Sequence, residues 1–97
     1  MKLTGTISSD PRKATAWHFD GTQQSAGEIA DGMGAGVWLE LSGEAEFTGK
    51  MMLVLPNGGY IIMLAGQYVI RDDDNYVTRC DSDDFGGFFQ ESSAHDG

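Results

Sequence analysis

The fold is decided by residues 51–65, which read Met-Met-Leu-Val-Leu-Pro-Asn-Gly-Gly-Tyr-Ile-Ile-Met-Leu-Ala. They belong to an uncharged stretch, residues 51–70, that is long enough to cross a membrane as a helix. The composition of Pro56–Gly59 strongly favours a turn, however, and the apolar runs on either side of it have the length of strands. The segment therefore predicts a buried hairpin and no membrane span. Because both faces of the runs are apolar, we expect a helix on one face and, on the other, a second subunit in a homodimer through the Met51–Ala65 hairpin.

A short helix is predicted upstream of this hairpin. Ser25 and Glu28 have the spacing of a capping box, which marks a helix start. The residues after Ser25 place four apolar side chains on one helical stripe, namely Ala26, Ile29, Ala30 and Met33. Three glycines between residues 32 and 36 supply the end of the helix.

Alternating patterns predict the remaining strands. In residues 13–19, Trp17 and Phe19 are expected on the face opposite His18. Further strands are expected at residues 37–42, 67–71 and 76–79, with a short edge strand at 46–50. The whole pattern predicts an α+β fold, a small antiparallel sheet of about five to six strands with one short helix packed on one face.

Length and cysteine usage limit the organisation of the chain. A chain of 97 residues closes one hydrophobic core, so we expect a single domain over residues 1–97 with an ordered core at about residues 12–90. Residues 92–97 are expected to form a flexible tail. The first ten residues lack the apolar run of a secretory signal, and a single cysteine, Cys80, suits a reducing compartment.

Charge is the most unusual property of the sequence. Six Lys and Arg residues face fifteen Asp and Glu residues, for a net charge of -9. Residues 71–97 alone hold two arginines against eight carboxylates, a net -6. Such a field repels phosphate backbones and attracts basic protein surfaces, so we expect no direct binding of nucleic acid. The predicted partner-binding residues are the acidic and aromatic residues of this segment, Asp72, Asp73, Asp74, Asp81, Asp83, Asp84, Phe88 and Glu91.

Other chemistry is disfavoured by spacing. No two His or Cys residues stand at metal-ligand spacing, and His95 falls in the expected tail. Residues 81–91 begin like a calcium loop, but Phe85 occupies a ligand position and Glu91 stands one residue short of the bidentate position. Cys80 would need His18, at the far end of the sequence, as its base. We therefore predict no metal, no cofactor and no enzymatic activity.

Several motifs resemble a family of small, mostly uncharacterised tailed-phage and prophage proteins. The matching segments are Lys13–Phe19 with Gly21, Gly66-Gln-Tyr-Val-Ile-Arg71, Tyr76, Cys80-Asp-Ser-Asp-Asp-Phe85 and Phe89-Gln90. The resemblance spans about residues 12–90. Three positions depart from the family pattern, since Ala65, Gln67 and Arg79 stand where the family has Pro, Asp and Pro. The resemblance implies a phage origin and an α+β fold. Together with the single cysteine and the lack of a secretory signal, it leads us to expect action in the host bacterial cytoplasm. It carries over no catalytic residue.

These observations lead to a functional expectation. We expect a small phage protein that inhibits a host factor, most plausibly a defence effector of the CRISPR kind, by occupying its basic nucleic-acid site. One alternative is an oligomeric sponge for small nucleotide signals, in which Trp17, Trp38 and Tyr60 stack a base. Another is a virion or packaging accessory protein that uses the apolar hairpin for assembly. The last is an acidic surface that serves solubility alone.

Overall fold

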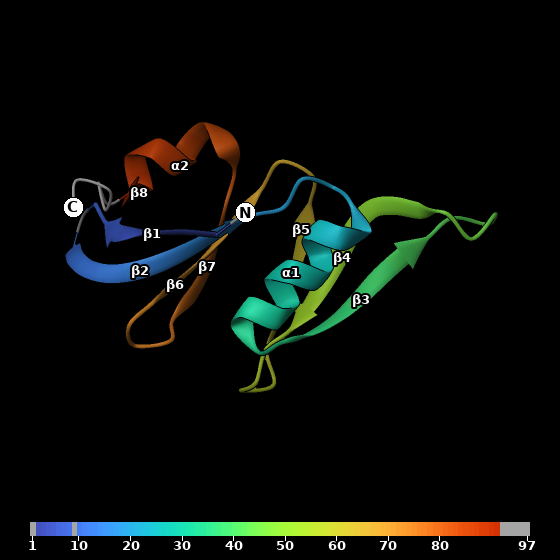
Figure 1. Ribbon diagram of the computed structural model, residues 1–97, viewed down its shortest axis with the longest axis horizontal. Helices are drawn as coiled ribbons and strands as arrows, with labels where there is room; N and C mark the ends of the chain where they lie inside the picture. The colour runs from blue at the N-terminus through green and yellow to red at the C-terminus, as the bar shows by residue number, and fades with distance from the viewer. Residues whose placement is uncertain (1, 9, 92–97) are drawn as a thin grey trace.

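Figure 1 shows the computed structural model, which describes residues 2–8 and 10–91. This part of the chain forms two antiparallel sheets and two helices, so the α+β class and a helix packed on one face are confirmed. The expected tail at residues 92–97, with His95, lies outside the described residues. The elements in chain order are β1 (Lys2–Ile7), β2 (Asp10–His18), α1 (Gln23–Met33), β3 (Gly36–Leu41), β4 (Phe47–Val54), β5 (Tyr60–Leu64), β6 (Tyr68–Asp72), β7 (Val77–Cys80), α2 (Ser82–Phe88) and β8 (Phe89–Glu91).

The predicted central hairpin is present as β4 and β5, which we call sheet B together with β3. Met51 pairs with Met63 and Leu53 with Ile61 across the hairpin. The turn is closed by the Leu55 amide, which donates to the Gly59 carbonyl over 2.7 Å, and Gly58 adopts a φ of 95° that favours glycine. The prediction of a separate edge strand at residues 46–50 is wrong. Those residues run straight into β4, the central strand of the order β3-β4-β5.

Sheet A has the strand order β7-β6-β2-β1-β8. The strand expected at residues 13–19 is β2, and Trp17 does lie on the face opposite His18, because neighbouring residues of a strand alternate between faces. Two strands of this sheet were not expected from the sequence. β1 pairs along almost the whole of β2, and β8 closes the far edge by pairing Gly5 with Glu91.

Helix α1 starts earlier than the capping-box spacing predicts. Its N-cap is Thr22, whose hydroxyl accepts from the Ser25 amide over 3.1 Å. Ser25 is instead a buried residue within the helix, and its hydroxyl donates to the His18 carbonyl. Asp20 stabilises the same turn, since its carboxylate accepts hydrogen bonds from the hydroxyl and the backbone amide of Thr22. These hydrogen bonds lower the pKa of Asp20. The helix ends as expected at Gly34, in the left-handed conformation.

Two clusters of buried side chains lie on the two faces of sheet A. The larger one joins α1 to both sheets and contains Trp17, Phe19, Ala26, Ile29, Ala30, Met33, Met51, Leu53, Met63 and Val69. The predicted apolar stripe of α1 is entirely within it. The smaller cluster lies under α2 and contains Ala14, Ala16, Ile70, Cys80 and Phe89. Sheet A therefore has α2 over one face and, on the other face, the larger cluster with α1 over the part that contains Trp17 and Val69, whereas sheet B has α1 on one face only (Figure 1).

No helix of the described residues combines the length and the apolar composition needed to cross a membrane.

Candidate functional site

The turn between β6 and β7, Asp72–Tyr76, is held by its own side chains. One carboxylate oxygen of Asp72 accepts from the amides of Asp74 and Tyr76, each over 2.9 Å. Asn75 takes the left-handed conformation, with a φ of 66°, as its position in a tight turn predicts. The Asp73 amide also donates to the Lys13 carbonyl over 3.1 Å, which ties the turn to β2. We call this segment the acidic turn.

Three carboxylates gather in the acidic turn. Oxygens of Asp72, Asp73 and Asp74 lie within 4.8 Å of one another. The Arg12 guanidinium is placed between two of them, 3.2 Å from Asp72 and 2.8 Å from Asp74. The Asp72 side chain is only 10% exposed, whereas that of Asp74 is 71% exposed. Asp73 and Asp74 are thus the carboxylates presented to solvent, and the cationic position within the cluster is filled by Arg12.

A second acidic group lies at the start of α2. Asp81 is the N-cap residue, and Asp83 and Asp84 are exposed in the first turn of the helix. The Gln67 amide donates to the Asp81 carboxylate over 2.7 Å. Negative charge at a helix N-terminus is favourable, so these residues have a local role in stabilising α2. The same helix replaces the extended calcium-binding loop considered from the sequence.

The structure does not bring the two acidic groups together. β6 and β7 pair Tyr68 with Cys80 at one end and Arg71 with Val77 at the other. The acidic turn follows the second end and Asp81 follows the first, so the four residues of β7, about 13 Å of strand, separate them. Glu91 lies on β8, at the opposite edge of sheet A from β7 (Figure 1). The predicted site residues therefore form separate groups and no single acidic face.

Phe88, by contrast, does lie beside the acidic turn. A hollow of about 190 Å³ is lined by residues of both, namely Ile7, Arg12, Ile70, Asp72, Tyr76, Thr78 and Phe88. Phe88 is half-buried there, and its carbonyl accepts from the Ser8 amide over 2.9 Å. The other two phenylalanines of the segment pack inward, since Phe85 stacks on Tyr68 at 3.6 Å and Phe89 is 3% exposed. We call the Phe88 hollow and the acidic turn together the hollow-and-turn site.

Arg12 is the residue of this site that sequence reasoning missed. It is separated from Asp72 and Asp74 by 60 and 62 positions, so only the antiparallel pairing of β2 with β6 brings them together. The alternation of the strand places Arg12 and Ala14 on one face of β2, which was the available signal.

Cys80 is placed unfavourably for nucleophilic chemistry. His18, Tyr68 and Cys80 are register neighbours on β2, β6 and β7, so Tyr68 separates the thiol from the imidazole by about 10 Å of sheet. Burial raises the pKa of the Cys80 thiol above its ordinary value of 9.0, and the charges of Asp84 and Asp81 raise it further. The thiol is therefore held in its unreactive neutral form.

This environment predicts slow alkylation of Cys80. At pH 8 the folded protein should react with iodoacetamide at least about tenfold more slowly than the protein in urea. Because the folded pKa is the higher one, the thiol's contribution to stability is present below the unfolded pKa and is lost as the pH rises through the folded value. The free energy of unfolding should therefore fall above pH 9.0, and Cys80→Ala should remove that part of the fall. Equal alkylation rates in the folded and unfolded protein would contradict this assignment.

A polar groove lies on the α1 side of sheet A. It measures about 480 Å³ and its lining includes Thr4, Thr6, Lys13, Thr15 and Arg71. The acidic turn contributes Asp72 and Asp73 to one end of the groove. Arg71 is partly committed elsewhere, because it donates to the Met33 carbonyl over 3.2 Å and lies over the Trp17 ring at 5.2 Å. The alternating residues Thr4, Thr6, Lys13 and Thr15 were the sequence signal for this face.

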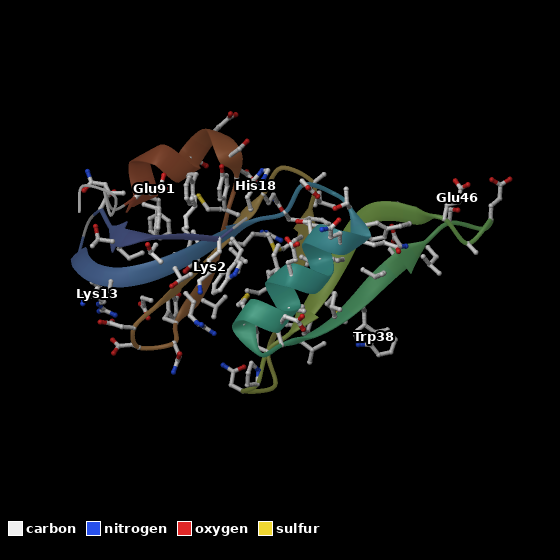
Figure 2. All side chains as sticks on the ribbon, viewed as in Figure 1. Lys2, Lys13, His18, Trp38, Glu46 and Glu91 are labelled. Carbon is white, nitrogen blue, oxygen red and sulfur yellow. The ribbon has the colours of Figure 1, made fainter. Side chains whose placement is uncertain are left out.

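The aromatic set proposed for nucleotide stacking is not assembled. Trp17 is 2% exposed in the larger core cluster, whereas Trp38 and Tyr60 are exposed on sheet B. Figure 2 shows Trp38 projecting from β3, away from α1.

The chain matches no family model, and neither the curated proteins nor the solved structures hold a significant match to it.

Proposed function

We propose that this chain is a non-catalytic binding protein that occupies a basic surface of a host factor through the hollow-and-turn site. The observation that carries the proposal is the hollow of about 190 Å³, whose lining joins Phe88 to Asp72 and Tyr76 of the acidic turn. Apolar anchors next to charge are the usual composition of binding hot spots. In keeping with the net charge of -9 and the resemblance to phage proteins, we further propose that the host factor is a defence effector.

The expected contact is a lysine or arginine side chain of the partner. Its apolar stem would lie against Ile7 and Phe88, and its charged end would reach Asp73 and Asp74. The hydrogen bonds of Asp72 hold the turn in place before binding, which lowers the entropy lost on association. Such a protein would compete with nucleic acid for a basic groove.

Neutralising the acidic turn is expected to abolish inhibition without unfolding the protein. In bacterial strains that each carry one defence system, expression of the wild type should restore phage plating in at least one strain. Asp73→Asn combined with Asp74→Asn should reduce this restoration by about tenfold or more, because close ion pairs at interfaces contribute several kcal/mol. Phe88→Ala should reduce it as well.

The matched control removes the same charge at the other end of the molecule. Glu44→Gln with Glu46→Gln changes two exposed carboxylates in the turn between β3 and β4, and should leave inhibition intact. Affinity for the partner should also fall as salt rises. The proposal fails if no strain responds, or if the two double variants lose activity equally.

One alternative has its own supporting observation. Lys13, Arg71 and three threonine hydroxyls line the polar groove, and this combination suits a small phosphorylated ligand. Asp73 at the same groove disfavours it. A cyclic dinucleotide at about 100 times its Kd would raise the free energy of unfolding by about 2.7 kcal/mol, so a thermal-shift assay separates the two functions.

A further inference from the structure

The face of sheet B that points away from α1 is apolar and exposed. Trp38, Met52 and Ile62 form one row across the three strands, and Val54 with Tyr60 forms the next. Trp38 is 68% exposed and Tyr60 is 65% exposed, whereas Met51, Leu53 and Met63 on the opposite face are buried under α1. We call this surface the outer face, and its residues are Trp38, Glu40, Lys50, Met52, Val54, Tyr60, Ile62 and Leu64.

β3 is exposed on both of its faces. Val37 and Leu39 lie on the α1 side of sheet B, in register with Leu53 and Met51, and are each 36% exposed, so α1 covers this edge strand only in part, whereas Trp38 lies on the outer face. An exposed aromatic and aliphatic surface of this extent is characteristic of an interface. The outer face is not flat, because Trp38 lies beside a hollow of about 220 Å³ whose lining includes Glu40, Lys50, Met52 and Ile62.

Charge identifies a second copy of this chain as the occupant. Two copies carry -9 each and repel one another over most of their surfaces. The outer face is the exception, since its two charged residues, Glu40 and Lys50, are of opposite sign and lie 4.0 Å apart. A basic partner gains nothing there and is drawn to the acidic turn instead. In a twofold arrangement, by contrast, Lys50 of each copy faces Glu40 of the other.

The shape of the molecule is compatible with the same occupant. The molecule extends over 46 × 25 × 23 Å, and sheet B and the acidic turn lie toward different ends of it (Figures 1 and 2). Contact through sheet B therefore keeps the acidic turns of two copies apart. The three strands have six, eight and five residues and present a face about 14 Å wide and about 17 to 27 Å long, which is smaller than a standard interface of about 800 Å² per partner and suits a weak, reversible dimer. Face-to-face packing of sheets covers such a surface at a spacing of about 10 Å.

We propose that the chain forms a homodimer by packing the outer faces of two sheets B against each other around a twofold axis. Trp38 of each copy fills the hollow beside Trp38 of the other. This contact is independent of the hollow-and-turn site, so the dimer presents two acidic turns at its ends.

Sedimentation equilibrium tests the dimer directly. The wild type should approach twice the chain mass as its concentration rises, and Trp38→Glu should weaken the association by at least about tenfold, because it buries a charge in the contact. Gln90→Glu is the matched control, since it adds the same charge at an exposed position on β8, which belongs to sheet A. It should leave the association unchanged. Thermal unfolding at low concentration should be similar for both variants.

Fluorescence gives a second measurement. In a Trp17→Phe background, Trp38 is the only tryptophan, and its emission should shift to the blue as the dimer forms. Rising salt should strengthen the dimer by screening the repulsion between the two acidic chains, whereas it weakens binding to a basic partner. Three results would overturn the proposal. The wild type could stay monomeric up to about 1 mM, Trp38→Glu could show the same average mass as the wild type at each concentration, or the dimer could weaken as salt rises. None of these results bears on the acidic turn.

Discussion

Phe19→Ala is expected to lower the free energy of unfolding by about 4 kcal/mol, because it removes a fully buried ring and leaves a cavity. Phe19 lies between β2 and α1, in the cluster that joins α1 to both sheets, and its ring is 6.3 Å from that of Phe47 on β4. Its amide and carbonyl also hold the chain segment before β6, through Gln67 and Gly66. The loss is a large share of the roughly 5–15 kcal/mol that stabilises a domain.

Urea unfolding followed by far-UV circular dichroism measures this effect. Tyr76→Ala is the control, because it truncates an aromatic side chain that is 70% exposed, and it should change stability by no more than about 0.5 kcal/mol. Equal losses in the two variants would show that Phe19 does not join the two sheets as its position indicates.

Gly5→Ala is expected to cost about 3 kcal/mol, because it forces β8 away from β1. A Cβ at residue 5 would lie 2.0 Å from the Gln90 carbonyl oxygen and 2.8 Å from the Phe89 ring. Backbone cannot yield at that distance, so the pairing of Gly5 with Glu91 must open. Phe89 then loses its burial, and the stack of Phe85 on Tyr68 loosens with it. The Phe88 hollow should be lost at the same time.

Thermal unfolding and the alkylation of Cys80 report this change together, because opening of the α2 layer exposes the thiol. The control is Gly27→Ala, at a position inside α1 where an added Cβ meets nothing within 4 Å. That variant should be more stable by about 1 kcal/mol, since alanine favours a helix interior. A Gly5→Ala protein with unchanged melting and unchanged Cys80 reactivity would mean that β8 does not seal this edge of the sheet.

Local sequence patterns predicted the acidic turn but not the placement of the other site residues. The strands expected at residues 67–71 and 76–79 leave a short acidic segment between them, and Asp72–Tyr76 forms a tight turn there because Asn and Asp satisfy turn geometry within a few residues. The grouping of all eight partner-binding residues on one surface was a different kind of expectation. It depends on where β7 ends relative to its turn and on the path of the chain after Cys80. Asp74 and Asp81 are close in the sequence, but this closeness does not predict that they share a surface, because β7 lies between them.

The chain by itself determined the α+β class, the β4–β5 hairpin, the stripe of α1 and the tight turn before β7. These features follow from periodicity and turn chemistry, which depend on a few neighbouring residues and can be recognised in each segment separately. Tertiary structure alone decided that β1 and β8 complete sheet A, that Arg12 reaches Asp72 and Asp74, and that Phe88 meets the acidic turn. The contacts of Arg12 and of β8 with β1 join residues 60 or more positions apart, and only the pairing of strands and the burial of two shared cores bring such residues together.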